Sequence, residues 1–353
     1  MSVSELLLSA QRLRGRQIGH DHPVSLARVM EHVEEEVAGG DVARFEPLPL
    51  GFLPLDDVLN GGLRAGDLMI VGGPFGVGKT IFALQMARNV AHSDEGNRAV
   101  YVCYEHDVAH LMARLVCLES AEQGYLKNKL TLSKLTDLTL GSPPGVGLIS
   151  TLRASRRYDA LLDEIDSYAD RLLLVRASGI YSTIERIQEW VEGVAARGAK
   201  RLLLVVDYLQ KIPASGNGVY SEAEATTQVT QGLKELAIST GIRVIAVAVS
   251  DRSGLEAKRM RFAHLRGGSA LQYEADVGLV LNNKHGIVSR EHLIYNTSNG
   301  ERLRNWVVMS VEKNRAGINA VDMEYALDVG HFRLVPTGGF VRERLVDEKV
   351  VMA

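Results

Sequence analysis

The feature that most constrains the fold is a glycine-rich segment between an apolar run and a helical pattern. Residues 68–72 form the apolar run, and residues 81–87 follow with helical spacing. The segment between them has the pattern G-x-x-x-x-G-K-T, and its residues are Gly73, Pro74, Phe75, Gly76, Val77, Gly78, Lys79 and Thr80. Glycines let backbone N–H groups close around phosphate oxygens, and the amino end of a helix adds partial positive charge. The segment therefore predicts a strand–loop–helix unit that binds a nucleoside triphosphate.

Two residues of this loop predict ATP and Mg²⁺ as the cofactors. Lys79 would reach the β- and γ-phosphates, and the Thr80 hydroxyl would bind Mg²⁺. Asp207 directly follows the apolar run 202–206, so we expect it at the carboxyl edge of a sheet, where ligands bind, as a second metal-binding group. Glu105 also follows an apolar run, and on its own it fits a water-orienting carboxylate and a solvated strand end equally well.

Short apolar runs alternate with helical periodicity, which is typical of an α/β fold around a mostly parallel sheet. Near-continuous apolar runs indicate strands that are buried on both faces. The predicted strands are residues 68–72, 99–103, 172–175, 202–206, 244–249 and 277–281, followed by a closing hairpin of 306–311 and 323–329. Residues 287–305 are polar, and we expect them to be rich in loops.

The chain divides by pattern into three parts. Residues 1–45 read as a short helical segment with Leu26, Val29, Met30 and Val33 on one stripe. Residues 46–340 form the α/β domain, and residues 341–353 form a tail. Two cysteines and no apolar run of about 18 residues argue against a disulfide framework and a membrane span. We therefore expect a cytoplasmic protein.

Several motifs resemble the carboxy-terminal ATPase domain of the DnaB-type replicative helicases. The segment from Leu50 to Asp56 resembles the entry into that domain. The segment from Asp207 to Gln210 resembles the second nucleotide motif. The remaining matches are Tyr104–Glu105 with Arg114 nine positions on, and the segment Lys313–Asn314–Arg315–Ala316–Gly317. Together the motifs cover about residues 46–336 in the family's order.

This resemblance implies a RecA-like core, a ring of six subunits, and ATP-driven movement along single-stranded DNA. It also implies that Glu105 is catalytic and that Arg114 faces the nucleotide. By the same resemblance, Lys313 and Arg315 reach into the ATP site of the neighbouring subunit. Arginine fingers stabilise charge on the transferring phosphoryl group, although such a pair is more often an ordinary surface feature. The resemblance also implies that residues 1–45 are a linker that docks on another subunit. A loader protein or a primase is a possible further partner.

The formal net charge of −3 means that a DNA site needs a local basic patch. Residues 252–268, here the basic segment, contain five cations with only Glu256 as a counter-charge. Its candidate DNA contacts are Arg252, Arg261 and Arg266, with Gly267 and Gly268 allowing close backbone approach to phosphates. Residues 211–220 are a second candidate. Either could instead be an ordinary solvated loop.

Two departures from the family leave other functions open. Ser250 is followed by Asp251 where the family places a phosphate-sensing Gln, and the stretch after Arg266 looks more like a RecA-type recombinase loop. A RecA- or RadA-like ATPase that forms filaments without unwinding DNA is therefore the alternative. A nucleotide-dependent assembly protein without DNA contact is a third reading. We expect residues 1–39 to supply little beyond a linker helix and not the family's primase-docking domain.

Overall fold

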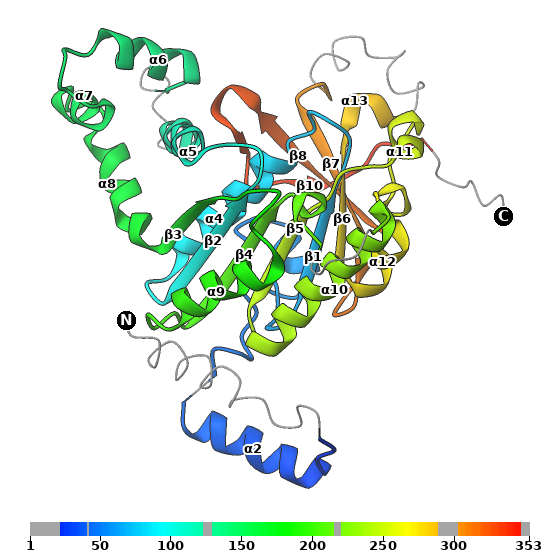
Figure 1. The fold of residues 1–353 in the computed structure, drawn as a ribbon. Coiled ribbons are helices and arrows are strands. Elements are labelled where there is room, and N and C mark those ends of the chain that lie inside the picture. Colours follow the sequence, from blue (N-terminus) through cyan, green and yellow to red (C-terminus); the bar gives the residue numbers. More distant parts are fainter. Residues whose placement is uncertain (1–21, 41, 123–128, 215–219, 289–302, 347–353) are drawn as a thin grey trace.

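The computed structural model describes residues 22–40, 42–122, 129–214, 220–288 and 303–346, and Figure 1 shows its fold. A central sheet carries six parallel strands: β1 Leu68–Gly72, β2 Asn97–Cys103, β3 Leu172–Arg176, β4 Arg201–Asp207, β5 Arg243–Val247 and β6 Val277–Asn283. Four antiparallel strands follow: β7 Trp306–Asn314, β8 Val321–Asp328, β9 Arg333–Leu334 and β10 Gly339–Phe340. The order across the sheet is β10-β8-β7-β6-β1-β5-β4-β2-β3, with β9 on β8. The predicted α/β fold with a mostly parallel sheet is confirmed.

Helices cover both faces of the sheet (Figure 1). The longer ones are α2 Leu26–Ala38, α4 Lys79–Ser93, α5 Val108–Glu122, α6 Leu132–Gly141, α8 Asp159–Tyr168, α9 Ile184–Ala195 and α10 Glu222–Thr240. The shorter ones are α3 Leu55–Val58, α7 Leu148–Ala154, α11 Arg252–Glu256, α12 Gly268–Glu274 and α13 Lys284–Ile287.

Alternating strand residues divide the core into two layers. Leu203 and Val205 of β4 pack with α4 in one cluster, whereas Leu202, Leu204 and Val206 pack with α9 and α10 in the other. Because successive side chains of a strand point to opposite faces, burial of both faces requires the continuous apolar runs seen in the sequence. The carboxyl ends of the parallel strands therefore meet at one edge, which carries the candidate site.

The predicted strand boundaries need small corrections. β5 ends at Val247, two residues before the predicted end, and Ser250 forms only an isolated bridge with Leu265. The predicted loop 287–305 lies mostly outside the described residues. Leu345, in the segment predicted as a tail, is buried and forms a bridge with Val288.

The helix predicted from the apolar stripe near residue 30 is present as α2, and its N-cap Ser25 accepts a hydrogen bond from the backbone of Arg28. Leu26 and Met30 are exposed on it. Its role as a linker stays a prediction. The predicted helical segment around residues 6–8 lies outside the described residues. Among the helices that the structure describes, none has the length and apolar character to cross a bilayer.

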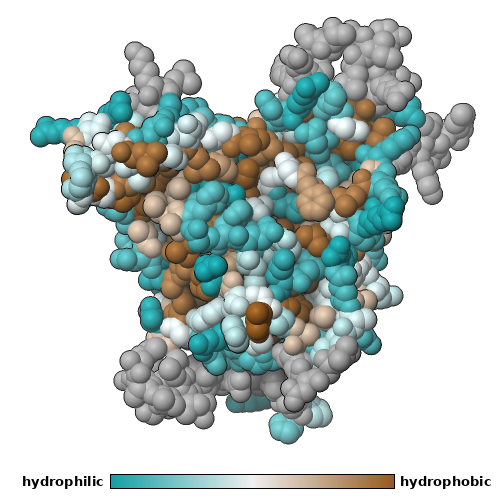
Figure 2. Space-filling model, turned by 45° about the horizontal axis from the view of Figure 1, so that its top comes forward, coloured by the Kyte–Doolittle hydropathy of each residue, from teal (hydrophilic) through white to brown (hydrophobic). Residues whose placement is uncertain are grey.

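A helical lobe that the sequence patterns did not indicate stands between β2 and β3. It consists of α6, α7 and α8 beside α5, and a separate apolar cluster holds it together. Figure 2 turns the carboxyl edge forward and shows hydrophobic side chains among hydrophilic ones on this lobe, at the upper left. Leu140, Val146 and Ile149 are its exposed apolar residues.

Candidate active site

The glycine-rich loop begins directly after β1 and ends where α4 starts at Lys79, as predicted. Gly78 caps the helix with φ of 96°, and Gly73 has φ of 151°. A Cβ atom at Gly73 would lie 2.5 Å from the carbonyl oxygen of Leu281. Glycine is needed at both positions because side chains disfavour positive φ. The loop thus directs backbone N–H groups and a helix amino end into one cavity.

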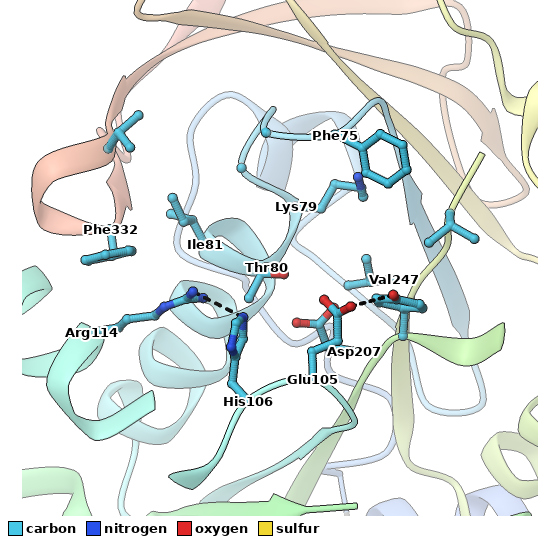
Figure 3. Close-up of a pocket in the computed structure, with 15 residues that line it drawn as sticks. Phe75, Lys79, Thr80, Ile81, Glu105, His106, Arg114, Asp207, Val247 and Phe332 are labelled. Atoms are coloured by element: carbon cyan, nitrogen blue, oxygen red, sulfur yellow. Dashed lines mark hydrogen bonds between the residues drawn. The ribbon is translucent and has the colours of Figure 1, made fainter. Parts of the chain in front are cut away.

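This cavity has a volume of about 320 Å³ and lies at the carboxyl edge of the sheet. Figure 3 shows the side chains that line it. They come from the loop, from the ends of β2, β4 and β5, and from α5 and the turn after β8; they are Phe75, Gly76, Gly78, Lys79, Thr80, Ile81, Glu105, His106, Arg114, Asp207, Tyr208, Val247, Val249, Val329 and Phe332. The structure therefore brings together all the nucleotide and metal candidates except three loop residues, Gly73, Pro74 and Val77, whose positions follow from the loop itself.

Lys79 folds back on its own loop. Its Nζ donates hydrogen bonds to the carbonyl oxygens of Gly73, at 2.8 Å, and Pro74, at 2.9 Å. Burial lowers the pKa of Lys79 to about 8, although Asp207 and Glu105 oppose this shift. A phosphate would supply the negative charge that this buried ammonium lacks.

Asp207 has the surroundings of a metal ligand. Its side chain is fully buried, and Oδ2 accepts a 2.8 Å hydrogen bond from the Tyr101 hydroxyl. Oδ1 has no hydrogen-bond partner. Burial raises the pKa of Asp207, and the Tyr101 hydroxyl acts in the opposite direction. Asp207 and Thr80 lie near each other in the cavity (Figure 3), and the Thr80 hydroxyl also favours the ionised form of Asp207. Buried carboxylate oxygens are normally paired, so the unpaired Oδ1 fits a hard divalent cation such as Mg²⁺.

Glu105 lies beside Asp207 because β2 and β4 are neighbours in register, with Cys103 opposite Asp207. Its carboxylate points into the cavity (Figure 3), and Oε1 accepts a 2.5 Å hydrogen bond from the Tyr208 hydroxyl. Glu105 is exposed, unlike Asp207. The two carboxylates therefore have different surroundings: one suits a metal ion, and the other suits a water molecule.

Arg114 closes the opposite side of the cavity from α5. Its guanidinium donates to Nε2 of His110, at 3.0 Å, and lies 3.1 Å from Nε2 of His106. It also stacks over the ring of Phe332 at 5.0 Å. Burial, together with the nearby Arg114, lowers the pKa of both histidines. The neutral rings leave the guanidinium charge available to an anionic ligand.

Among the side chains at this site that were not predicted are Tyr101, His106, Tyr208 and Phe332. His106 directly follows Glu105, so its position in the chain was an available signal. The two tyrosines look like ordinary strand or turn residues. Phe332 follows a distant strand, and no local pattern marks it.

Lys313 and Arg315 do not line the cavity of their own chain. Lys313 donates to the carbonyl oxygens of Gln272 and Tyr273. Arg315 donates to Tyr273 O at 2.6 Å and to Asp276 Oδ1 at 3.2 Å. Both therefore lie toward the amino edge of the parallel sheet, away from the glycine-rich loop.

The basic segment is less positive than predicted, because the expectation of a single counter-charge is wrong. Besides the local Glu256, carboxylates from distant parts of the chain approach its arginines. The ion pairs are Arg252–Glu256 at 2.9 Å, Arg259–Asp322, Arg261–Glu312 at 3.3 Å and Arg266–Glu222 at 2.6 Å. Arg259 is buried, whereas Arg252 is 92% exposed in its side chain. Arg252, Arg261 and Arg266 remain the predicted DNA contacts.

The two glycines of this segment have a packing role in the described chain. Gly267 has φ of 83°, and a Cβ there would lie 2.3 Å from Cγ2 of Thr226. A Cβ at Gly268 would lie 2.8 Å from the carbonyl oxygen of Ala263. Close packing within the chain therefore accounts for glycine at both positions, and their contact with DNA phosphates stays a prediction.

The sequence of the chain is similar to those of known DNA helicases and of a DNA repair protein. Residues 47–141 and 148–333 match the family model described as DnaB-like helicase C terminal domain. The chain is 29% identical over 232 residues to the replicative DNA helicase DnaB of Geobacillus stearothermophilus, which covers 65% of this chain and 46% of the relative. It is 28% identical over 127 residues to the DNA repair protein RadA of Mycobacterium tuberculosis, which covers 35% of this chain and 26% of the relative.

Solved structures show the same fold. The ATPase domain of G40P matches with a TM-score of 0.64 and 19% identity, covering 89% of this chain and 99% of that one. A DnaB-like replicative helicase, solved in a study of its interactions with primase, matches with a TM-score of 0.64 and 18% identity, covering 94% and 75%. The chain spans about half the length of the curated DnaB relative described above.

Proposed function

Because the chain belongs to the family of DnaB-like helicase C-terminal domains, we propose that it is an ATP-hydrolysing motor that moves along single-stranded DNA during replication. The observation that carries this proposal is the meeting of Lys79, Thr80, Asp207 and Glu105 around one cavity. The recombinase alternative is less favoured, since the RadA match covers only 35% of the chain.

ATP binding is proposed to replace the internal contacts of the glycine-rich loop. Lys79 would exchange its two carbonyl partners for the β- and γ-phosphate oxygens, and Arg114 would approach the nucleotide from α5. Thr80 and the unpaired oxygen of Asp207 would hold Mg²⁺. When bound, this ion neutralises charge on the phosphates during phosphoryl transfer.

Glu105 is proposed to orient the attacking water. Its carboxylate is exposed to the cavity and close to Asp207, and the Tyr208 hydroxyl restrains one of its oxygens. The other oxygen is therefore available to accept a hydrogen bond from water. A carboxylate in this position directs the nucleophile at the phosphoryl group, and catalysis then depends on positioning and charge stabilisation.

We propose that Lys313 and Arg315 complete the site of a neighbouring subunit in a ring of six. Their own cavity does not contain them. The exposed apolar side of α2 would pack on an adjacent subunit and hold the ring together. A loader or primase is a further proposed partner, and the cytoplasm is the proposed location.

Single-stranded DNA is proposed to bind the basic segment through its phosphates. Arg252, Arg261 and Arg266 would exchange their carboxylate partners for phosphate oxygens. Contacts of this kind follow the strand without reading bases. Exposed ion pairs contribute little stability, so a polyanion can displace them.

The proposal is tested by strand displacement on forked DNA with ATP and Mg²⁺, beside particle imaging. The wild-type chain should form rings and displace the strand. Glu105→Gln should bind ATP and lose hydrolysis, whereas the control Glu235→Gln, the same change at an exposed position of α10, should remain active. Helical filaments on DNA without displacement would instead support the recombinase alternative.

A further inference from the structure

The side chain of Gln210 joins the wall of the nucleotide cavity to the basic segment. Gln210 lies in the short turn Leu209–Lys211, three residues after Asp207. Its Oε1 accepts a 3.2 Å hydrogen bond from the backbone N–H of Val249. Its Nε2 donates a 3.1 Å hydrogen bond to the carbonyl oxygen of Arg266. One amide group therefore touches a residue that lines the cavity and a candidate DNA-binding residue.

The two partners of Gln210 are also linked to each other. The N–H of Arg266 donates a 3.0 Å hydrogen bond to the carbonyl oxygen of Val249, and Ser250 forms a bridge with Leu265. The amide of Gln210 hydrogen-bonds to both members of this pair: its oxygen accepts from the N–H of Val249, and its nitrogen donates to the C=O of Arg266. Only a side chain of this length with both a donor and an acceptor makes both contacts.

Asp251 directly follows Ser250, at the position where the family places a phosphate-sensing Gln. Its side chain is already engaged within its own segment. The Asp251 carboxylate caps α11, accepting from the N–H of Gly254 at 2.8 Å and from the Ser253 hydroxyl at 2.7 Å. Asp251 does not line the cavity. Gln210, in contrast, contacts the backbone of Val249, which lines the cavity just after β5.

Gln210 also shares its segment with two groups of the reaction site. Asp207 is three residues before it, and Tyr208, two residues before it, holds Glu105 through its hydroxyl. A shift of the turn would therefore act on Tyr208, which supports Glu105, and on the end of β4 that carries Asp207. The candidate DNA segment 211–220 begins at the next residue.

We propose that Gln210 is a positioning residue that couples binding of single-stranded DNA to the nucleotide site. This inference rests on the proposed function. DNA phosphate would draw Arg266 from Glu222, which now pairs with it at 2.6 Å. The resulting displacement of the Arg266 backbone acts on the Gln210 amide, and through it on Val249 and on the turn that carries Tyr208.

The test compares two variants of the full chain. Gln210→Leu removes both hydrogen bonds at similar size, and Gln210→Glu keeps the acceptor for Val249 but loses the donor to Arg266. ATP turnover is measured with and without saturating oligo(dT), and the stimulation ratio is the readout. Because coupling between sites is typically worth a factor of about 5–150, we expect both variants to lose about fivefold or more of this ratio.

A second readout uses the reciprocity of coupling. The affinity for labelled oligo(dT) is measured with and without a non-hydrolysable ATP analogue, and the affinity for the analogue is measured with and without oligo(dT). In both variants, the change in DNA affinity caused by the analogue should shrink by the same factor as the change in analogue affinity caused by DNA. The control Gln188→Leu removes a 2.7 Å hydrogen bond to Glu192 on α9 and should keep the wild-type coupling. A purely structural role would lower thermal stability without changing these ratios.

The outcomes are distinct. If the wild-type chain is stimulated by DNA and Gln210→Glu is stimulated equally, the coupling role of Gln210 is overturned while the proposed function stands. If the wild-type chain itself shows no effect of DNA on turnover or on nucleotide affinity, the proposed function and the coupling fail together. Loss of coupling in Gln210→Glu with a wild-type melting temperature supports the inference.

Discussion

Replacing Tyr101 by Phe tests how the metal-binding carboxylate is held. Tyr101 and Asp207 are both fully buried, and the Tyr101 phenol donates a 2.8 Å hydrogen bond to Oδ2 of Asp207. Oδ1 has no partner at hydrogen-bond geometry, so Tyr101→Phe leaves this buried carboxylate with only the nearby Thr80 hydroxyl as a hydrogen-bonding group that favours its ionised form. Hydrogen bonds to charged groups contribute about 1.5–3 kcal/mol. We expect the free energy of unfolding to fall by about that amount at pH 8.

The effect should depend on pH in one direction. Burial raises the pKa of Asp207, whereas the Tyr101 hydroxyl favours the ionised form. Burial of the ionised form therefore opposes folding above the folded-state pKa, and stability is gained as pH falls through it. The variant loses a bond to the ionised form, which raises the folded-state pKa of Asp207 further. The difference in stability between variant and wild type is therefore full only above the variant's pKa, and it vanishes below the wild-type pKa.

Urea unfolding at several pH values, without metal, measures this difference. The control is Tyr325→Phe, because Tyr325 is equally buried but its hydroxyl contacts neutral groups, the N–H of Leu55 at 3.1 Å and the Met323 sulfur at 3.9 Å. The control should cost about 0.5–1.5 kcal/mol, with little dependence on pH. If Tyr101→Phe costs no more than the control at every pH, the phenol does not support an ionised Asp207.

Three further results are expected. Arg88→Leu leaves the fully buried Glu119 carboxylate without the 2.5 Å partner that now neutralises it, so urea unfolding should show a loss of about 3–5 kcal/mol. Gly267→Ala places a Cβ 2.3 Å from the Thr226 side chain at positive φ; a melting experiment should show destabilisation of about 1–3 kcal/mol, and wild-type stability would contradict the packing role. Arg315→Ala should bind nucleotide normally and hydrolyse it about 10³-fold or more slowly, and undiminished turnover would exclude a finger role.

The sheet was predictable because its strands are buried on both faces. The run 202–206 shows this burial directly in the sequence, and the structure places it in β4. The lobe of α6–α8 was missed because its apolar residues pack mainly on one another and on α5 rather than on the sheet. Its helices therefore lack the alternation with strands that identified the rest of the fold.

The site was predicted as far as local motifs extend. The glycine-rich loop is marked by its own pattern and Asp207 by the apolar run before it, whereas Glu105 was assigned only through the family resemblance. The supporting hydroxyls of Tyr101 and Tyr208 were not predictable, because their roles depend on strand register and on a turn. The counter-charges of the basic segment were missed for the same reason, since they come from residues distant in the chain, such as Glu222 and Glu312.

The position of Arg315 makes a lone subunit a poor catalyst if the finger role holds. Arg315 pairs with Asp276, whose Oδ2 accepts a 2.8 Å hydrogen bond from the N–H of Leu68 at the start of β1. The glycine-rich loop begins after the last residue of β1, Gly72. The five residues of β1, at roughly 3.3 Å each, separate the start of this strand beside Arg315 from the glycine-rich loop by ~16 Å. An arginine side chain cannot span this distance. Turnover per subunit should therefore rise with protein concentration and reach a plateau when the assembly is complete, whereas a rate independent of concentration, measured on material that stays monomeric, would show that each subunit hydrolyses ATP alone.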